Sequence, residues 1–114
     1  MEEKTLFTKI IEREVPANIV YEDEQCIAFH DIHPVAPIHV LLVPKQPIPS
    51  IAAASEDDQA VLGYLFAQVS QLVKQLGCED AFRVVINNGA GAGQTVFHLH
   101  LHIIAGRALQ WPPG

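Results

Sequence analysis

The sequence lacks long hydrophobic runs and has few basic residues. Its longest apolar stretch, residues 38–43, is far shorter than the roughly 20 residues that span a bilayer, so no membrane partner is expected. Only 7 Lys and Arg residues stand against 13 Asp and Glu, which argues against a nucleic acid partner held through its phosphates. A small anionic ligand is not excluded, because backbone amides and neutral donors can hold one.

Cysteine is also scarce. Cys26 and Cys78 form no CxxC pair, so the sequence predicts neither a disulfide framework nor a cysteine metal site. The first residues show neither the basic nor the apolar region of a secretory signal, and a reduced, cytoplasmic setting is expected. The chain of 114 residues is 49% hydrophobic and 18% charged, which suits a single domain over residues 1–114.

The hydrophobic patterns predict two helices and five strands. The helices are expected over residues 5–13 and 56–76, the second with Ser55 as its N-cap and Gly77 at its end. This order of elements favours the α+β class, with an antiparallel sheet that packs one apolar face on the long helix. The strands are expected over residues 18–22, 25–30, 38–43, 82–87 and 95–104.

Histidines alternate with apolar residues in the last predicted strand. They are His98, His100 and His102. Because the side chains of a strand alternate between its faces, the three imidazoles are expected on one face. The opposite face is expected to belong to the core and holds Phe97, Leu99, Leu101 and Ile103.

Three interpretations of this row of imidazoles compete: a solvent face without chemistry, a metal site, and a hydrogen-bonding set with separate roles. One ion cannot readily bind all three, because the outer two lie about 13 Å apart along a strand and must approach within about 4 Å to share zinc. A two-histidine metal site would need His39 or Asp31. In the third interpretation, a neutral imidazole attacks phosphorus while its neighbours orient it or protonate the leaving group.

A glycine-rich loop, residues 88–93, comes shortly before the histidines. Glycine backbone can approach a phosphate closely and offer its N–H groups. Asn87 precedes the loop, and Gln94 and Thr95 follow it as neutral donors. Next to the histidines, these residues favour a phosphate site.

The run from His98 to Ile104 resembles the signature of the histidine triad (HIT) superfamily. The resemblance extends over about residues 6–114 and is closest to the Hint branch, the histidine triad nucleotide-binding proteins. The other matching segments are Phe29-His30-Asp31-Ile32, Pro37-Ile38-His39-Val40, Asn87, Gly93-Gln94-Thr95 and Trp111-Pro112-Pro113-Gly114.

The resemblance implies a homodimer of HIT-like α+β fold whose sheets join across the interface. It implies a hydrolase without a cofactor that cleaves the P–N bond of adenosine or guanosine 5′-phosphoramidates. A nucleotidyl-histidine intermediate would form and release the nucleoside monophosphate. Related branches hydrolyse dinucleoside polyphosphates or transfer nucleotidyl groups, and a purine-nucleotide sensor with incidental hydrolysis is a further alternative.

The resemblance also implies roles for single residues. His100 would be the nucleophile, His102 would contact the phosphate, and His98 and His39 would orient the nucleophile. Asp31 would accept the ribose hydroxyls, and Trp111 would approach the active site of the partner subunit. The phosphate loop would use Asn87, Gly93, Gln94 and Thr95, and the base pocket would use Leu6, Phe7, Ile10, Val15, Phe29 and Ile32.

Several of these residues have simpler explanations or depart from the family pattern. Asp31 could only cap its turn, Trp111 could only hold the tail, and the apolar pocket residues could be ordinary core. Thr95 stands where serine is common, and β-branching restricts its rotamers. His33 stands where a small polar residue is frequent and is expected to be a spectator. His30 is expected to be structural or to face solvent, and surface charges are expected at Lys45, Arg83 and Arg107.

Overall fold

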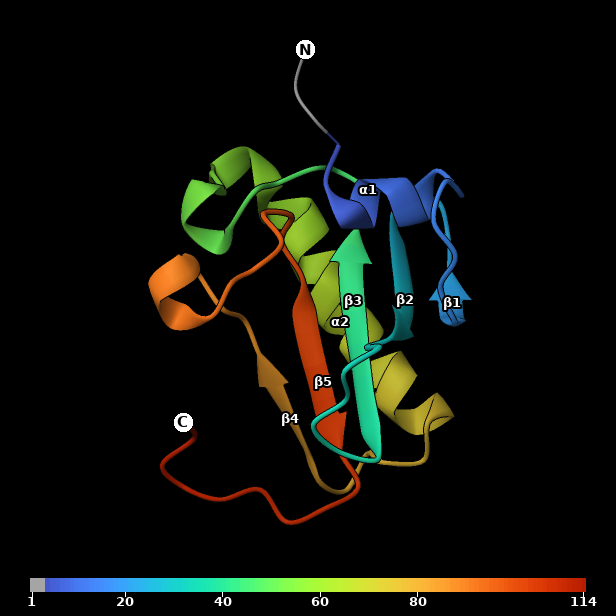
Figure 1. Cartoon of the computed structure of the whole chain (residues 1–114), viewed down its shortest axis with the longest axis vertical. Helices are drawn as coiled ribbons and strands as arrows, with labels where there is room; N and C mark the ends of the chain where they lie inside the picture. Colours follow the sequence, from blue (N-terminus) through green and yellow to red (C-terminus); the bar gives the residue numbers. More distant parts are fainter. Residues whose placement is uncertain (1–3) are drawn as a thin grey trace.

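Five strands form one antiparallel sheet in the computed structural model, which describes residues 4–114 (Figure 1). Across the sheet their order is β1-β2-β3-β5-β4, so the last strand of the chain lies between β3 and β4. The predicted α+β class with five antiparallel strands is confirmed. The strands are β1 (Ile19–Glu22), β2 (Cys26–His30), β3 (Ile38–Pro44), β4 (Phe82–Val85) and β5 (Leu101–Ala105).

Two α-helices pack on opposite faces of this sheet. α2 (Gln59–Gln75) lies behind the sheet in Figure 1 and contributes Leu72 to the larger hydrophobic core. α1 (Leu6–Ile11) lies on the other face and contributes Phe7 to a second, smaller core. The short 3-10 turns in the described part of the chain are Ile51–Ala53, Glu56–Asp58 and Ala90–Ala92.

Strand alternation divides β2 and β3 between the two cores. Ala28 and Leu42 belong to the core on the α2 face, whereas Phe29 and Leu41 belong to the core on the α1 face. All four side chains are buried. Because α1 has only 6 residues, it covers one end of its face (Figure 1). Beyond it, His39 of β3 and His102 of β5 contact each other on this face.

The predicted signals set both ends of the long helix. The Ser55 hydroxyl accepts a hydrogen bond from the backbone N–H of Asp57 (3.2 Å), and the Asp58 carboxylate accepts one from the backbone N–H of Ser55 (2.9 Å). This capping box encloses a 3-10 turn, after which the α-helix begins at Gln59. Gly77 ends the helix with a φ of 73°, a left-handed conformation that favours glycine.

The first helix is shorter than the predicted residues 5–13. Thr5 caps its start, because the Thr5 hydroxyl accepts a hydrogen bond from the backbone N–H of Thr8 at 3.2 Å. The helix ends at Ile11, and Arg13 then adopts a positive φ of 65°, which a right-handed helix cannot continue.

The last strand is also shorter than predicted. It begins at Leu101 rather than at residue 95, and the stretch before it is held by a hydrogen bond from the Leu99 N–H to the Ile48 carbonyl (2.6 Å). The predicted alternation nevertheless continues back to Leu99, which is buried in the same core as Leu101 and Ile103. It fails at Phe97, which is 50% exposed rather than part of the core.

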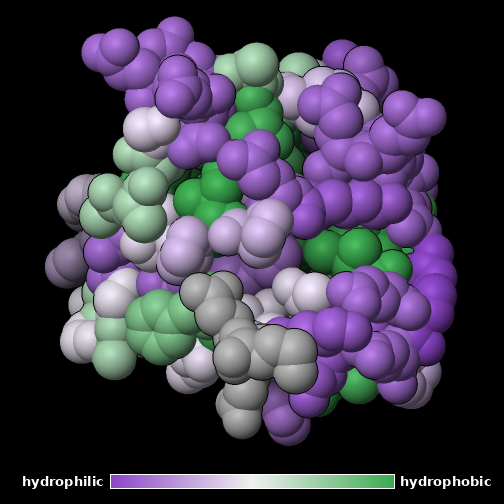
Figure 2. Space-filling model, turned by 90° about the horizontal axis from the view of Figure 1, so that it is seen from above, coloured by the Kyte–Doolittle hydropathy of each residue, from purple (hydrophilic) through white to green (hydrophobic). Residues whose placement is uncertain are grey.

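The surface is mostly hydrophilic at the end of the molecule that carries α1. Seen from above in Figure 2, the most strongly hydrophobic atoms are recessed between polar side chains. Within residues 4–114, no helix combines the length and the apolar character needed to cross a membrane.

Candidate active site

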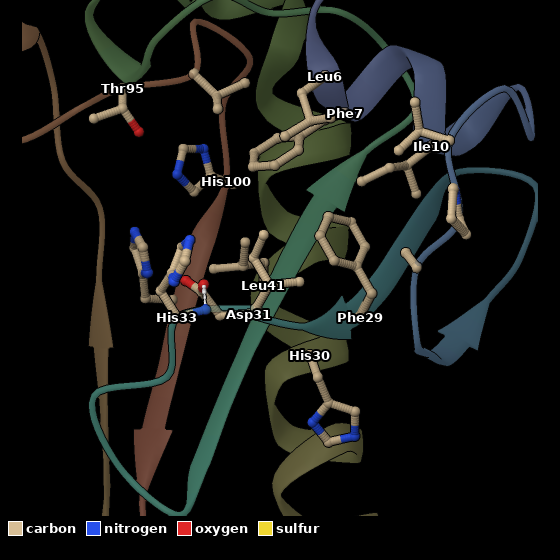
Figure 3. A pocket seen from close by; sticks show the side chains of 16 residues that line it. Leu6, Phe7, Ile10, Phe29, His30, Asp31, His33, Leu41, Thr95 and His100 are labelled. Carbon is tan, nitrogen blue, oxygen red and sulfur yellow. Dashed lines mark hydrogen bonds between the residues drawn. The ribbon is translucent and has the colours of Figure 1, made fainter.

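A pocket of about 240 Å³ opens on the sheet face that carries α1 (Figure 3). The rings of Phe7 and Phe29 meet edge to face in its wall, with centroids 5.5 Å apart. One end of the pocket is apolar and the other carries imidazoles. The predicted site residues that line it are Leu6, Phe7, Ile10, Val15, Phe29, Asp31, Ile32, Thr95, His100 and His102.

His98, the first histidine of the alternating run, is fully buried. Its Nε2–H donates to the carbonyl oxygen of Pro44 at 2.7 Å. Because the neutral ring then has its proton on Nε2, Nδ1 accepts from the hydroxyls of Thr5 and Thr8, at 3.3 and 3.4 Å. Burial lowers the pKa of His98 and keeps the ring neutral at pH 7. This imidazole therefore ties α1 to the end of β3.

His100 is oriented by the backbone of His98. Its Nδ1–H donates to the His98 carbonyl oxygen at 2.7 Å, so the neutral ring carries its lone pair on Nε2. Phe7 packs edge-on against the ring, with centroids 4.8 Å apart. Burial lowers the pKa of His100, which keeps Nε2 unprotonated at pH 7. His100 thus brings an unprotonated nitrogen to the lining of the pocket.

His39 and His102 form a directed hydrogen-bonded chain. The backbone N–H of Val35 donates to His39 Nδ1 at 3.1 Å, so His39 holds its own proton on Nε2. This Nε2–H donates to His102 Nδ1 at 2.9 Å, which favours the tautomer of His102 with its proton on Nε2. Both rings are neutral at pH 7, because burial lowers the pKa of His39 and lowers that of His102 to about 4.

Within residues 4–114, the Nε2 atom of His102 has no hydrogen-bond partner. It is the one buried side-chain nitrogen or oxygen of this described part of the chain that is left unsatisfied. Such an unpaired group costs about 1–3 kcal/mol, which a bound acceptor would recover. The rings of His102 and His100 have centroids 5.0 Å apart and line the same pocket. Together they offer a ligand one nitrogen lone pair and one N–H donor.

Asp31 brings a negative charge to this end of the pocket. Its Oδ1 accepts a hydrogen bond from the backbone N–H of His33 at 2.8 Å, and its Oδ2 lies 3.4 Å from His39 Nε2. One oxygen therefore caps the turn and the other faces a histidine. The charge of Asp31 raises the pKa of His39, His100 and His102, but burial is the larger effect in each ring.

A metal ion is the alternative chemistry for this end of the pocket. One oxygen of Asp31 and one nitrogen each of His39 and His102 lie within 4.8 Å of one another. Zinc binds unprotonated ring nitrogens. His39 Nδ1 already accepts the Val35 N–H, so Nε2 of the neutral ring holds a proton and cannot coordinate. These donors fit a hydrogen-bonded chain better than an ion.

Comparison with known proteins identifies the family, because the model of the HIT domain matches residues 12–109. The chain belongs to the HIT domain family. An uncharacterized HIT-like protein of Synechocystis sp. is 58% identical over 114 residues, which are 100% of each chain. A solved HIT family hydrolase from Legionella pneumophila Philadelphia 1 superposes with a TM-score of 0.95 at 40% identity, covering 97% of this chain and 100% of that one. A solved histidine triad nucleotide-binding protein from Candida albicans has a TM-score of 0.81 at 29% identity, covering 97% and 85%.

Only two of the four predicted catalytic histidines of this HIT protein reach the pocket. His100 and His102 line the pocket, whereas His98 and His39 lie behind it. The contact that orients His100 comes from the carbonyl of His98, while the imidazole of His98 points toward α1 and Pro44. His39 contacts His102 rather than His100.

The residues of the predicted phosphate loop of this HIT protein differ in whether they line the pocket. Thr95 lines the pocket, but the buried Gln94 donates its amide protons to two backbone carbonyls and accepts from the N–H of Gly89. Gln94 thus holds the loop in shape. Gly93 has a φ of 94°, which favours glycine, and a side-chain nitrogen of Asn87 lies 3.7 Å from where a Gly93 Cβ would be.

Two predicted site residues of the HIT chain are strongly exposed. Ile32 lines the pocket, yet it is 81% exposed. Trp111 is 82% exposed in the tail after β5 and does not line the pocket. A hydrogen bond from Arg83 to the Gln110 carbonyl (2.8 Å) holds this tail.

Sequence reasoning missed the residues that hold the histidines of the HIT domain. Thr5 and Thr8 contact the His98 ring. The sequence hints at them only through their three-residue spacing, which is typical of a helix N-cap. The Val35 N–H sets the proton position of His39 through the backbone, which no residue type reveals. Arg107, expected as a surface charge, donates its Nε–H to the Val35 carbonyl at 2.9 Å and so supports this loop.

Proposed function

We propose that this HIT protein is a purine nucleoside phosphoramidase of the Hint branch. It hydrolyses the P–N bond of adenosine or guanosine 5′-phosphoramidates and releases the nucleoside monophosphate. One observation carries the proposal: the unprotonated Nε2 of His100 lies beside the unpaired Nε2–H of His102 in one pocket. A phosphoryl group presents an electrophilic phosphorus and an acceptor oxygen side by side, which matches this pair.

The first step transfers the nucleotidyl group to His100. Its Nε2 attacks phosphorus, the P–Nε2 bond forms and the P–N bond to the amine breaks. The amine leaves with that electron pair and takes up a proton, with the hydroxyl of Thr95 in the pocket lining as the proposed donor that is resupplied by solvent. The imidazolium that forms keeps its Nδ1–H on the His98 carbonyl.

The second step frees the product. Water attacks phosphorus, the P–Nε2 bond breaks, and His100 recovers its lone pair while one proton returns to solvent. In both steps the Nε2–H of His102 donates to the phosphoryl oxygen on which charge develops. The chain through His39 and Val35 holds this proton in place before the substrate arrives.

The rest of the pocket suits the nucleoside. Phe7 and Phe29 provide an apolar wall for a flat base, and Ile32 can close over it at the rim. Asp31 lies between this wall and the imidazoles, where it accepts the ribose hydroxyls. The nucleotide-binding relative from Candida albicans and the Trp111-Pro112-Pro113-Gly114 ending support this assignment.

The proposed assembly is a homodimer. β4 is an edge strand of the sheet, and its Phe82 is 37% exposed, so a second copy could continue the sheet there. The exposed Trp111 would then reach toward the site of the partner subunit.

The decisive experiment is a steady-state assay on the 5′-phosphoramidates of adenosine and guanosine, with diadenosine polyphosphate as the competing substrate class. The wild type should release monophosphate from the phosphoramidates, and His100→Ala should lose turnover while keeping nucleotide binding within a few-fold. Mass spectrometry of quenched reactions should find the nucleotidyl adduct on His100. Full activity of His100→Ala would refute the proposal, and so would strong inhibition by EDTA, which favours the metal alternative.

A further inference from the structure

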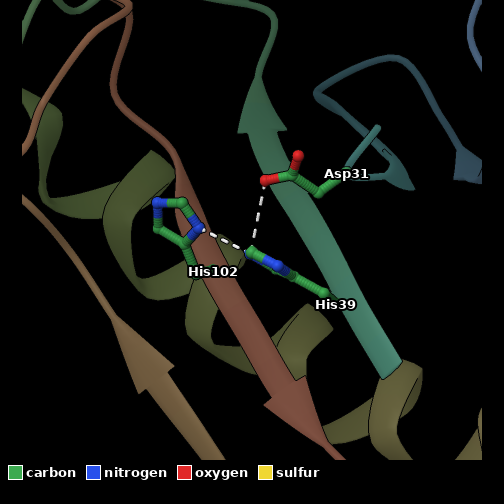
Figure 4. Close-up of side chains that lie close together, drawn as sticks. All are labelled: Asp31, His39 and His102. Carbon is green, nitrogen blue, oxygen red and sulfur yellow. Dashed lines mark hydrogen bonds and ion pairs between the residues drawn. The ribbon is translucent and has the colours of Figure 1, made fainter. Parts of the chain in front are cut away.

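The Nε2–H of His39 has two acceptors within reach. His102 Nδ1 lies 2.9 Å away, and Oδ2 of Asp31 lies 3.4 Å away in a different direction from the same ring atom (Figure 4). His39 has only this one proton to donate, because its Nδ1 accepts the Val35 N–H. The two acceptors therefore compete for a single proton.

Asp31 is the acceptor that a ligand can reach. Its side chain is 19% exposed and lines the pocket, whereas His39 is only 4% exposed behind it. Its Oδ1 is occupied by the His33 N–H, which leaves Oδ2 with free acceptor capacity. A ligand hydroxyl that donates to Oδ2 would satisfy this oxygen and reduce its attraction for the His39 proton.

The destination of this proton decides what His102 offers to a phosphate. When His39 donates to His102 Nδ1, the proton of His102 sits on Nε2 and points into the pocket as a donor. When Oδ2 of Asp31 attracts the same N–H, the hydrogen bond from His39 to His102 Nδ1 weakens, and the tautomer of His102 with its proton on Nδ1 gains population. Its Nε2 would then face the phosphate with a lone pair, which repels the anionic oxygen.

We propose that Asp31 is a positioning residue that couples ligand hydroxyls to the phosphate-facing proton of His102 through His39. The proposal rests on the proposed function above. A ribose hydroxyl on Asp31 releases the His39 proton to His102 and keeps the donor on His102 Nε2. Binding of the ribose therefore strengthens the donor that faces the phosphate, and the ribose hydroxyls contribute to the chemical step as well as to binding.

The kinetic test compares adenosine 5′-phosphoramidate with its 2′,3′-dideoxy analogue. In the wild type, loss of the hydroxyls should lower kcat about fivefold or more in addition to raising KM. In Asp31→Asn, which keeps an oxygen for the His33 N–H, kcat should become nearly equal for the two substrates. Asp80→Asn is the matched control, because Asp80 is exposed before β4 and outside the pocket, and it should behave as the wild type.

A second variant traces the route of the coupling. In His39→Gln the hydroxyls should still lower KM through Asp31, but their effect on kcat should disappear. Hydroxyls that change only KM in the wild type would overturn the coupling, because Asp31 would then be a simple binding residue. An unchanged kcat effect in His39→Gln would also overturn it.

Nuclear magnetic resonance of ¹⁵N-labelled histidines gives a readout that needs no turnover. Adenosine 5′-monophosphate should raise the fraction of His102 protonated on Nε2 above that seen with 2′,3′-dideoxyadenosine 5′-monophosphate. The difference should vanish in Asp31→Asn, and an identical His102 tautomer in all states would reject the coupling. The proposed function fails separately, through absence of phosphoramidate hydrolysis by the wild type.

Discussion

Neighbouring residues of β5 face two differently built sides of the sheet. Leu101 and Ile103 are buried in the core against α2, at 1% and 0% exposure. His102 lies between them in sequence and points to the opposite face, where imidazoles replace aliphatic side chains. The α2 face is held by apolar packing, which depends little on direction. On the other face the apolar core ends beside the histidines, which are held by directional hydrogen bonds that fix the proton positions.

The contrast between the two faces of β5 shows that burial alone does not distinguish core residues from active-site residues. His98 is as buried as Leu101, but its ring nitrogens have protein partners. His102 Nε2 is buried without one, among the described side chains. A buried polar atom that the protein leaves unpaired is the sign that distinguishes the functional face.

The sharpest test of the contrast is removal of the unpaired donor. His102→Ala should lower kcat on adenosine 5′-phosphoramidate by about 10²–10³, the typical loss of one preorganised donor. His102→Gln keeps an N–H group and should lose less. Urea unfolding should show a smaller loss of stability in His102→Ala than in Leu101→Ala, because the lost Nε2–H was unsatisfied and the His39 Nε2–H, which loses His102 as acceptor, still has Asp31 at 3.4 Å. A stable, fully active His102→Ala would erase the difference between the two faces.

The neighbouring position on the α2 face should respond in the opposite way. Leu101→Ala should lower the free energy of unfolding by about 2–5 kcal/mol, because it opens a cavity in a packed core. The kcat of the folded protein should stay unchanged. Denaturant titration and the phosphoramidate assay check both parts, and a loss of kcat without loss of stability would contradict the assignment of Leu101 to the scaffold.

His98 tests whether a histidine of the signature can behave as a core residue. His98→Ala removes the imidazole donor of the Pro44 carbonyl, which should cost about 1–3 kcal/mol of stability for this buried group, whereas the hydroxyls of Thr5 and Thr8 still hydrogen-bond to each other. The carbonyl that orients His100 remains, so kcat should fall less than in His102→Ala. Lost activity at unchanged stability would instead place the imidazole in the chemistry.

The most gradual expected effect is the pH dependence of stability. The folded protein lowers the pKa of His39, His98, His100 and His102 below the ordinary value near 6.5, so the unfolded chain binds more protons as the pH falls. Stability should therefore be full above about pH 6.5 and decline toward about pH 4, where His102 is protonated in the fold.

Urea midpoints between about pH 7 and pH 5 measure this decline before most carboxylates titrate. Substitution of His102 by Ala should flatten the slope, whereas Leu101→Ala should leave it unchanged. Stability that rises on acidification would show that the imidazoles on this face are not held neutral.

The sequence predicted the elements because each depends on local signals. The capping box at Ser55 and the left-handed Gly77 bound the long helix as expected, and the strands alternate as their hydrophobic patterns predict. The prediction failed at Phe97, because the chain joins the sheet only from Leu101 onward. Where a strand begins depends on its partner, here β3, and not on its own residues.

The sequence alone determined the fold class and the row of histidines, since periodicity and residue type suffice for these. The apolar residues of the pocket wall were expected only from the resemblance to the HIT superfamily, because residue type does not separate a pocket wall from ordinary core. Tertiary structure decided which nitrogen of each ring carries a proton. That choice depends on single atoms far away in the chain, such as the Pro44 carbonyl against His98 and the Val35 N–H against His39. An imidazole can donate or accept at either nitrogen, so only its folded neighbours can select one state.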